Sequence, residues 1–146
     1  MLKNAGMTVT TVESCTGGLI SATLVDVTGA SAVLNQAYVT YANEAEHSLV
    51  GVKEKTLETY GAVSEQTVRE MSAGALKISG ADISVAVSGI AGPSSDSTDK
   101  PVGLIYLAVN YNNEITVKKL TNQFDVNIRE NNRNSAANEA LKLVCE

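Results

Sequence analysis

The sequence has little of what a zinc site, a disulfide framework or a membrane anchor requires. Its 146 residues contain one histidine and two cysteines, so a structural zinc site is close to excluded. Cys15 and Cys145 lie near opposite ends of the chain, which indicates reduced thiols and a cytoplasmic protein. No apolar run approaches the ~20 residues of a membrane span, and residues 1–6 lack the apolar segment of a signal peptide.

Basic residues are also too few and too dispersed to suggest a nucleic-acid or membrane partner. The chain has 11 Lys and Arg against 16 Asp and Glu, for a net charge of −5. Wrapping duplex nucleic acid requires a basic face, and no cluster of Lys or Arg suggests an anionic membrane surface. The apolar fraction of 44% is typical of a globular protein. We therefore expect one domain over residues 1–146, with neither nucleic acid nor membrane among its partners.

The stretch over residues 11–20 organises the chain, because it forms a clear junction between a strand and a helix. An extended segment over 7–13 leads into a turn of small polar residues and glycines, and an apolar-periodic helix over 16–26 follows. The turn contains Ser14, Cys15, Thr16, Gly17 and Gly18. Such a turn lies at the carboxyl end of a strand, where open α/β sheets bind ligands.

Two interpretations of this turn remain open. In the first, a hydroxyl, a thiol and a second hydroxyl form a candidate nucleophile site, and free N–H groups at the start of the helix face an anion or a developing oxyanion. Cys15 is then a second candidate nucleophile, because a helix N-terminus favours a thiolate. In the second, the turn is glycine-rich, with a Ser or Thr helix cap and a small buried cysteine.

The rest of the chain alternates helices and strands. We expect further strands over 37–41, 81–88, 103–111 and 114–120, and further helices over 44–50, 53–60, 65–79 and 127–144. Asn43 and Ser64 are the expected N-caps. Asn112 and Asn113 form a two-residue turn that makes the last strand pair antiparallel. The fold class is α/β, with a mixed sheet of about five strands and helices packed on it.

Hydroxyl residues mark two of the strand ends. Ser14 and Ser88 each lie at the carboxyl end of an expected strand and precede glycine-containing turns. If the two strands are neighbours, both hydroxyls face one crevice, and Gly89 and Gly92 allow a ligand to approach the backbone closely. The alternative is an ordinary strand-ending turn. A third strand end, over residues 41–46, is explained equally well by a helix cap with a solvated acidic first turn.

Motifs in these loops and beyond them follow one another along most of the chain. They are E-S-C-T-G-G-L (13–19), T-G-A-S (28–31), Y-A-N-E-A (41–45), L-V-G-V (49–52), Y-G-A-V-S (60–64), G-I-A-G-P (89–93) and K-P-V-G (100–103). In this order they resemble the carboxyl-terminal domain of the CinA family, which includes stand-alone nicotinamide-nucleotide amidases. The resemblance implies a three-layer α/β/α fold and a metal-free amidohydrolase without a cofactor. Its small-molecule substrate would be nicotinamide mononucleotide, converted to nicotinate mononucleotide and ammonia.

The resemblance also assigns roles to matching residues. Ser14 maps to the nucleophile, and Ser88 stands where the family usually has a threonine. Tyr41 corresponds to a ring near the substrate. The other substrate-binding positions that the resemblance implies are Cys15, Thr16, Gly17, Gly18, Gly89, Gly92, Lys100, Arg129 and Arg133. The amino-terminal domain of full-length CinA proteins has no counterpart among these motifs.

Glu46 stands where the family has a lysine that is thought to activate the serine. A carboxylate near its usual pKa of ~4.3 is a far weaker base than an amine whose pKa is close to neutrality. Burial would raise the pKa of Glu46 but would also protonate it, and its negative charge would oppose a phosphorylated substrate. On a helix His47 points about 100° away from Glu46, so we expect it at the surface. Among the amines that remain, Lys100 lies in a matched motif and is preferred over Lys53 and Lys55.

Two further departures concern the phosphate of the substrate. The family loop after Pro93 is glycine-rich, whereas residues 94–99 here contain Asp96 and Asp99, whose charge suits a phosphate poorly. The family pattern F-x-G-x-R-x-x-x-R has lost its glycine here, and both arginines are shifted by one residue relative to the phenylalanine. Arg129 and Arg133 share a helix face, and they either bind a phosphate or form a solvated surface.

Three functions remain open on this basis. The first is an active amidohydrolase with Ser14 as nucleophile, Ser88 beside the oxyanion and Lys100 or Glu46 as base. The second is a catalytically silent relative that binds a nucleotide-like ligand or a protein. The third is a hydrolase of a different amide or ester, in which Glu46 recognises a cationic group. A homo-oligomer also stays open, with the last hairpin as a candidate surface and a partner chain as a candidate source of the lysine.

Overall fold

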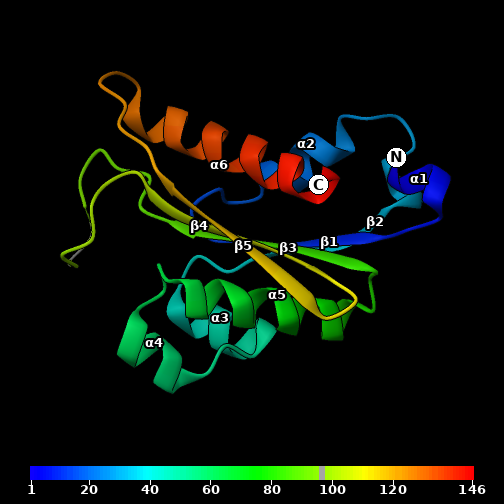
Figure 1. Ribbon diagram of the computed structural model, residues 1–146, viewed down its shortest axis with the longest axis horizontal. Coiled ribbons are helices and arrows are strands. Elements are labelled where there is room, and N and C mark those ends of the chain that lie inside the picture. Colours follow the sequence, from blue (N-terminus) through cyan, green and yellow to red (C-terminus); the bar gives the residue numbers. More distant parts are fainter. Residues whose placement is uncertain (96–97) are drawn as a thin grey trace.

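The computed structural model describes residues 1–95 and 98–146 and consists of one sheet between two layers of helices (Figure 1). The sheet has five strands in the order β2-β1-β3-β4-β5. Their bounds are Val9–Glu13 (β1), Leu34–Val39 (β2), Ile83–Gly89 (β3), Leu104–Tyr111 (β4) and Glu114–Thr121 (β5). Strands β2, β1 and β3 run parallel, and β4 is antiparallel to both of its neighbours. The expected mixed sheet is confirmed.

Helices cover both faces of this sheet. Their bounds are Leu2–Ala5 (α1), Leu19–Val25 (α2), Asn43–Val50 (α3), Glu54–Tyr60 (α4), Glu65–Ser79 (α5) and Ile128–Cys145 (α6), with a short 3₁₀ turn at Ala30–Ala32. Helices α2 and α6 lie on one face, and α3, α4 and α5 lie on the other (Figure 1). The three-layer α/β/α arrangement is therefore confirmed as well.

Successive side chains of a strand alternate between the two faces of the sheet, so apolar side chains pack into a core on each face. Val87 of β3 packs with Ile20 of α2 and with α6. Its neighbour Ala86 packs on the opposite face with Val50 of α3 and Met71 of α5. Because successive side chains of a strand point to opposite faces, β3 buries residues on both sides. The near-continuous apolar run over 83–87 is what such a central strand requires.

Local signals set several element ends as expected. Ser64 Oγ accepts a hydrogen bond from the N–H of Thr67 and caps α5, which ends at the left-handed Gly80. Asn112 and Asn113 have φ angles of 53° and 63°. Positive φ at both positions is the signature of a type I′ turn, and it fixes the register of the β4–β5 hairpin.

Several expected boundaries were wrong, and three of them bear on the loops around Ser14. The helix expected from residue 16 begins at Leu19, because Gly17 and Gly18 have φ angles of 60° and 99° that a helix cannot contain. The second strand spans 34–39 instead of 37–41, because its pairing with β1 runs from Leu34 to Val39. Ala42 is the N-cap of α3, and the residue after it is already helical.

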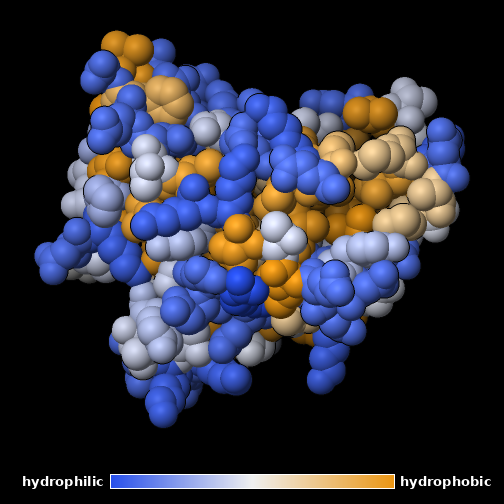
Figure 2. All heavy atoms as spheres, in the orientation of Figure 1, coloured by the Kyte–Doolittle hydropathy of each residue, from blue (hydrophilic) through white to orange (hydrophobic). Residues whose placement is uncertain are grey.

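Nothing among the helices of the described ranges combines the length and the apolarity that a bilayer crossing demands. Apolar side chains gather on the surface beside the two chain ends (Figure 2). A hollow in this region is lined by Leu2, Ile83 and Val144, among other residues. Because Ile83 begins β3, this hollow lies at the amino ends of the parallel strands, at the opposite end of the sheet from Ser14 and Ser88.

Candidate active site

Ser14 and Ser88 lie beside each other at the carboxyl ends of β1 and β3. The two strands are adjacent and parallel, with Glu13 opposite Val87. The N–H of Ser14 donates to the carbonyl oxygen of Val87 at 3.0 Å and so continues the ladder beyond β1. The expectation that these two strands are neighbours is confirmed.

Thr40 is a third hydroxyl residue in the same place, and sequence analysis did not single it out. Its N–H donates to the carbonyl oxygen of Glu13 at 2.9 Å, which sets it beside Ser14. The residues two positions earlier in these three strands all pack toward α3 and α5: Tyr38, Val12 and Ala86. Because side chains two positions apart share a face, Thr40, Ser14 and Ser88 form a hydroxyl row directed at the same layer. The one signal for Thr40 was its place at the end of a strand.

Glu46 is buried, in contrast to the expectation of a solvated first turn for α3. Its exposed fraction is 1%, whereas Glu44 in the same turn is exposed. Val50, one turn later on the same helix face, packs in one cluster with Val12 of β1. Since α3 starts three residues after Thr40, Glu46 lies closer to the strand ends than Val50 does. Glu46 therefore lies on the face of α3 that packs on β1, one turn nearer the start of the helix than Val50.

Burial raises the pKa of Glu46 to about 8, because a carboxylate loses hydration when it leaves water. At neutral pH roughly one molecule in ten therefore carries the charge. Buried oxygens with no hydrogen-bond partner among the described residues include Thr40 Oγ1, Glu46 Oε2 and Ser88 Oγ. Buried polar groups are normally paired, so three unpaired oxygens near one end of the sheet mark this place as the candidate site.

The N–H groups at the start of α2 are not free for a ligand, which corrects the sequence-based expectation. Glu13 is fully buried, and its carboxylate accepts hydrogen bonds from the N–H groups of Gly18, Ile20 and Ser21 at 3.1, 3.0 and 2.9 Å. The hydroxyl of Thr16 adds a fourth at 2.7 Å. The chain thus supplies its own anion to this helix end, where a phosphate or an oxyanion would otherwise bind.

Cys15 is a core residue and not an activated thiol. It is 6% exposed and packs in the cluster that contains Ile20. Burial raises the pKa of its thiol to about 12, against a smaller opposing effect of the nearby Arg133. The expectation of a thiolate at a free helix N-terminus is therefore wrong, since Glu13 already occupies that end. Of the alternative interpretation, the glycine-rich turn and the small buried cysteine are confirmed, whereas the Ser or Thr cap is wrong, because the N-cap is Gly18 and Glu13 accepts from the helix N–H groups.

Arg133 of α6 binds the backbone of the turn that carries Ser14. Its Nε donates to the carbonyl oxygen of Cys15 at 3.2 Å, and its Nη2 donates to that of Thr16 at 2.8 Å. A guanidinium that makes two hydrogen bonds fixes direction as well as distance. The side chain therefore links the last helix to the first strand–turn–helix unit.

Arg129, one turn earlier on α6, binds two other loops. Its Nη1 donates to the carbonyl oxygen of Gly92 at 2.9 Å, and its Nη2 donates to the hydroxyl oxygen of Tyr41 at 2.8 Å. Tyr41 is held at the surface by this contact and is 63% exposed. With Arg133, these contacts show that the interpretation of a merely solvated helix face is wrong.

The remaining predicted positions contact protein. Lys100 Nζ donates to the carbonyl oxygens of Tyr60 and Val63, the latter at 2.6 Å, so its amine is held at the junction of α4 and α5. A Cβ atom at Gly89 would lie 2.6 Å from Ile105 Cγ1. A Cβ atom at Gly92 would overlap Val102. Both glycines thus permit close packing of protein segments, whereas we expected room for a ligand. In the polar loop over 94–99, residues 96 and 97 lie outside the described residues.

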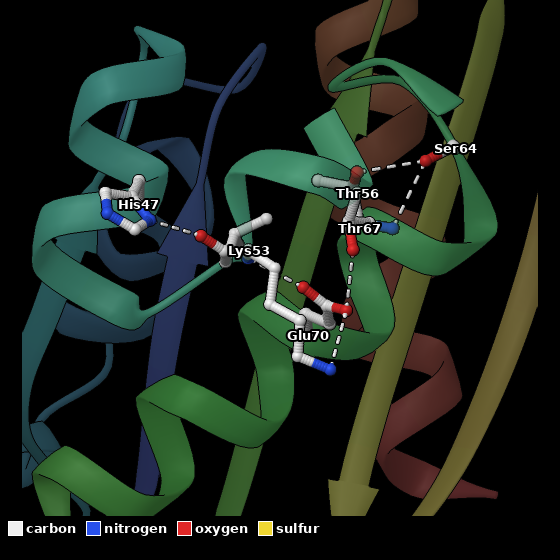
Figure 3. Close-up of polar contacts among 7 residues, drawn as sticks. His47, Lys53, Thr56, Ser64, Thr67 and Glu70 are labelled. Carbon is white, nitrogen blue, oxygen red and sulfur yellow. Dashed lines mark hydrogen bonds and ion pairs between the residues drawn. The ribbon is translucent and has the colours of Figure 1, made fainter. Parts of the chain in front are cut away.

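His47 lies on the outer side of α3, as its position on the helix predicts. Its Nδ1 lies 2.7 Å from the carbonyl oxygen of Val52 (Figure 3). Nearby, the Glu70 carboxylate of α5 accepts hydrogen bonds from the N–H of Lys53 and the hydroxyl of Thr56 at 2.8 and 2.9 Å. Lys53 Nζ lies 3.7 Å from the same carboxylate. These contacts hold α4 on α5 and give His47 and Lys53 partners in the outer layer.

Comparison with known proteins identifies the family that this chain matches. The family model for the CinA C-terminal domain matches residues 1–146. The chain is 44% identical over 144 residues to a CinA-like protein of Kosmotoga olearia. The matched residues make up 99% of this chain and 34% of that protein. The chain is 51% identical over 107 residues to the nicotinamide-nucleotide amidohydrolase PncC of Escherichia coli K12, which covers 73% of this chain and 65% of that protein. The chain thus spans about a third of the first relative and just under two thirds of the second.

Solved structures agree with this similarity. The competence damage-inducible protein A of Klebsiella pneumoniae superimposes with a TM-score of 0.93 at 36% identity, over 98% of this chain and 87% of that chain. The competence/damage inducible protein CihA of Agrobacterium tumefaciens gives a TM-score of 0.93 at 41% identity, over 99% and 87% of the two chains. These values indicate the same arrangement of strands and helices throughout.

Proposed function

Because the chain belongs to the CinA C-terminal domain family, we propose that it is a serine amidohydrolase that releases ammonia from the carboxamide of nicotinamide mononucleotide. Relatives named nicotinamide-nucleotide amidohydrolase support this assignment. The chain spans 65% of one such relative, so both its activity and its substrate are part of the proposal.

One observation carries the proposal: a buried carboxyl, whose pKa burial raises to about 8, and the hydroxyls of Thr40 and Ser88 all have a buried oxygen without a hydrogen-bond partner among the described residues. A general base works best when its pKa lies near the working pH. A carboxylate at its usual pKa of ~4.3 would be too weak a base to accept a serine proton. Burial gives Glu46 the basicity that the family resemblance assigns to a lysine at this position.

In the proposed reaction, the Glu46 carboxylate takes the proton of Ser14 as Ser14 Oγ attacks the carboxamide carbon. The hydroxyl of Ser88 donates a hydrogen bond to the oxyanion that forms. The C–N bond then breaks, its electron pair stays on nitrogen, and Glu46 returns the proton so that ammonia leaves. Glu46 then deprotonates a water molecule, whose oxygen attacks the acyl carbon. The bond from that carbon to Ser14 Oγ breaks, Glu46 returns the proton to Ser14 Oγ, and the acid is released.

In the resting structure Glu46 and Ser88 each have a buried oxygen that is unpaired among the described residues. Glu46 Oε2 makes no hydrogen bond to Ser14 or to any other described residue. Catalytic hydrogen bonds often tighten only when substrate binds, and a bridging water can also carry the proton. In the proposed complex, the exposed ring of Tyr41 contacts the pyridine. Arg129 and Arg133 retain N–H donors that can bind the phosphate.

The test is ammonia release from nicotinamide mononucleotide by the purified chain. Ser14→Ala should abolish release, and Glu46→Gln should lower the rate ~10²–10⁴-fold, because it removes the general base. Ser48→Ala changes an exposed residue of the same helix and should leave the rate unchanged. Release that survives Ser14→Ala would exclude the serine mechanism.

A second candidate function is nucleotide binding without turnover. It is favoured by the same raised pKa, because most Glu46 carboxyls are protonated at neutral pH and cannot act as a base. The test compares ammonia release with the Ser14→Ala blank up to about pH 9, which is a unit above the pKa at which the base ionises. Release no faster than the blank, in a protein that still binds the nucleotide, would favour this candidate.

A further inference from the structure

Asn132 of α6 is a buried polar residue whose amide oxygen is unpaired. It is 1% exposed, and its Nδ2 donates to the carbonyl oxygen of Ala91 at 3.0 Å. A carbonyl oxygen only accepts hydrogen bonds, so the atom that faces Ala91 must be the amide nitrogen. Asn132 Oδ1 is therefore left as a buried acceptor without a partner in the described part of the chain.

Packing alone does not account for an asparagine at this position. Ala136 lies one turn later on the same face of α6, and it is fully buried in the apolar cluster that also contains Ala91. An unpaired buried acceptor costs stability, whereas an apolar side chain carries no such acceptor. Positions that break a local rule in this way are typical of functional sites. The hydrogen bond to Ala91 is thus the feature that distinguishes Asn132 from its apolar surroundings.

That hydrogen bond completes a set of contacts from one face of α6 to the loops after three strands. Arg129, Asn132 and Arg133 are spaced i, i+3 and i+4, so they share a helix face. Arg133 binds the turn after β1. Arg129 binds Gly92 after β3 and Tyr41 after β2. Asn132 adds a second contact with the loop after β3, at the carbonyl that precedes that of Gly92.

Helix α6 therefore holds two consecutive carbonyls of this loop, those of Ala91 and Gly92. Arg129 binds the second of them through Nη1 at 2.9 Å and the Tyr41 hydroxyl through Nη2 at 2.8 Å. Because a guanidinium is a rigid planar fork, a shift of the loop changes the direction in which Arg129 meets Tyr41. The contact of Asn132 limits that shift, since it fixes the preceding carbonyl.

We propose that Asn132 is a positioning residue, which holds the loop after β3 so that Arg129 and Tyr41 keep their places at the candidate site. Its effect on substrate rests on the proposed function, in which Tyr41 contacts the pyridine and Arg129 binds the phosphate. Ser14 depends less on this contact, since other hydrogen bonds hold its turn. Loss of the Asn132 amide should therefore weaken substrate binding and leave the chemical step unchanged.

NMR relaxation of the backbone amides in the isotope-labelled chain tests the contact without substrate. In Asn132→Leu, the order parameters of Gly92 and Tyr41 should fall from the rigid value of about 0.85 toward about 0.6, while that of Gly17 stays unchanged. Asn132→Ala removes the same donor without adding volume, and it replaces the leucine variant if that variant fails to fold. Asn138→Leu, at an exposed position of α6, is the matched control. Unchanged order parameters at Gly92, or an equal fall at Gly17, would overturn the proposal.

Steady-state kinetics provide the second measurement. In Asn132→Leu and Asn132→Ala, KM for nicotinamide mononucleotide should rise about tenfold while kcat stays within about twofold, because only substrate binding is weakened. Arg133→Lys should show the opposite division between KM and kcat, since it misplaces the nucleophile. A fall in kcat at unchanged KM would overturn the role assigned to Asn132. A chain that releases no ammonia would refute the proposed function, and the order parameters would then decide the positioning role by themselves.

Discussion

Arg133 Nη2 donates a 2.8 Å hydrogen bond to the carbonyl oxygen of Thr16, and this contact joins the last helix to the turn that carries Ser14. The same guanidinium binds the carbonyl oxygen of Cys15 through Nε. A lysine keeps the charge but cannot make this pair of directed bonds. The turn therefore depends on geometry that only an arginine supplies.

We expect Arg133→Lys to loosen this turn without unfolding the protein. Ammonia release should fall by about tenfold, mainly through kcat, since a misplaced nucleophile reduces turnover more than binding. Hydrogen exchange of the Gly17 amide should become faster. The matched control is Arg69→Lys, because Arg69 lies on the far layer with Glu65 as its partner. Unchanged exchange at Gly17 in Arg133→Lys would contradict the role of this contact.

The proposed base predicts a specific pH dependence of activity. Below the pKa of Glu46, about 8, kcat/KM should rise about tenfold per pH unit and then level off, because the deprotonated carboxyl is the active form. The measurement is ammonia release across this range, with the Ser14→Ala blank subtracted. A profile that is flat around the pKa would refute Glu46 as the base.

The same group makes the fold less stable at higher pH. Its folded-state pKa of about 8 lies above the ordinary value of 4.5, so between these values the folded protein holds a proton that the unfolded chain has lost. The stabilisation is complete below the lower value and disappears as the pH rises through the higher one. The total change is about 5 kcal/mol at most.

Glu46→Gln should remove this dependence, because its amide does not ionise. In urea unfolding, the variant should match the original protein in acid solution and exceed it in stability above the folded-state pKa. Glu44→Gln, in the same turn but exposed, is the control and should change little. A constant difference between Glu46→Gln and the original protein at all pH values would argue against a buried proton.

The two cysteines should differ in reactivity. Cys145 is exposed and Cys15 is buried, and the pKa of the Cys15 thiol is about 12. Since the thiolate is the reactive form, iodoacetamide should label only Cys145 in the native protein and both residues after unfolding. Mass spectrometry of labelled peptides makes the comparison, with Cys145→Ser as the control. Rapid labelling of native Cys15 would show that it is accessible.

Glu13→Ala should destabilise the protein by about 3 kcal/mol or more, because the N–H groups of Gly18, Ile20 and Ser21 would lose a charged acceptor. Glu13→Gln should cost less, since its amide oxygen still accepts. The free energy of unfolding in urea measures both, and Glu58→Ala at an exposed site is the control. A loss within about 0.5 kcal/mol for Glu13→Ala, as at ordinary surface sites, would mean that this helix end finds other partners.

The sheet could be predicted because its signals are local. The apolar run over 83–87 identifies a central strand, and Asn112 with Asn113 specifies the hairpin whatever the rest of the chain does. The meeting of Ser14 and Ser88 followed from one assumption about strand order, which the structure bears out. These features depend on a few residues that are close in sequence.

The protonation state of the site could not be predicted in the same way. Glu44 and Glu46 look alike in the sequence, but only Glu46 is turned inward with Val50 by the way α3 packs. Glu13 is part of a recognisable motif, yet its use as an internal cap depends on strand alternation, which turns it toward α2. Burial therefore decides the chemistry of both acids, and burial is a property of the packed molecule.

Because the chain is synthesised from its amino end, α6 is made after the loops that its arginines contact. Ser14, Thr40, Glu46 and Ser88 all precede residue 128, where α6 begins, so a ribosome has made them before either guanidinium emerges. A nascent chain that stops short of α6 keeps the Glu13 hydrogen bonds of the turn after β1 but lacks the contacts of Arg133 with that turn. A product truncated before α6 would therefore carry Ser14, Thr40, Glu46 and Ser88 without the arginine contacts that link α6 to the loops around them.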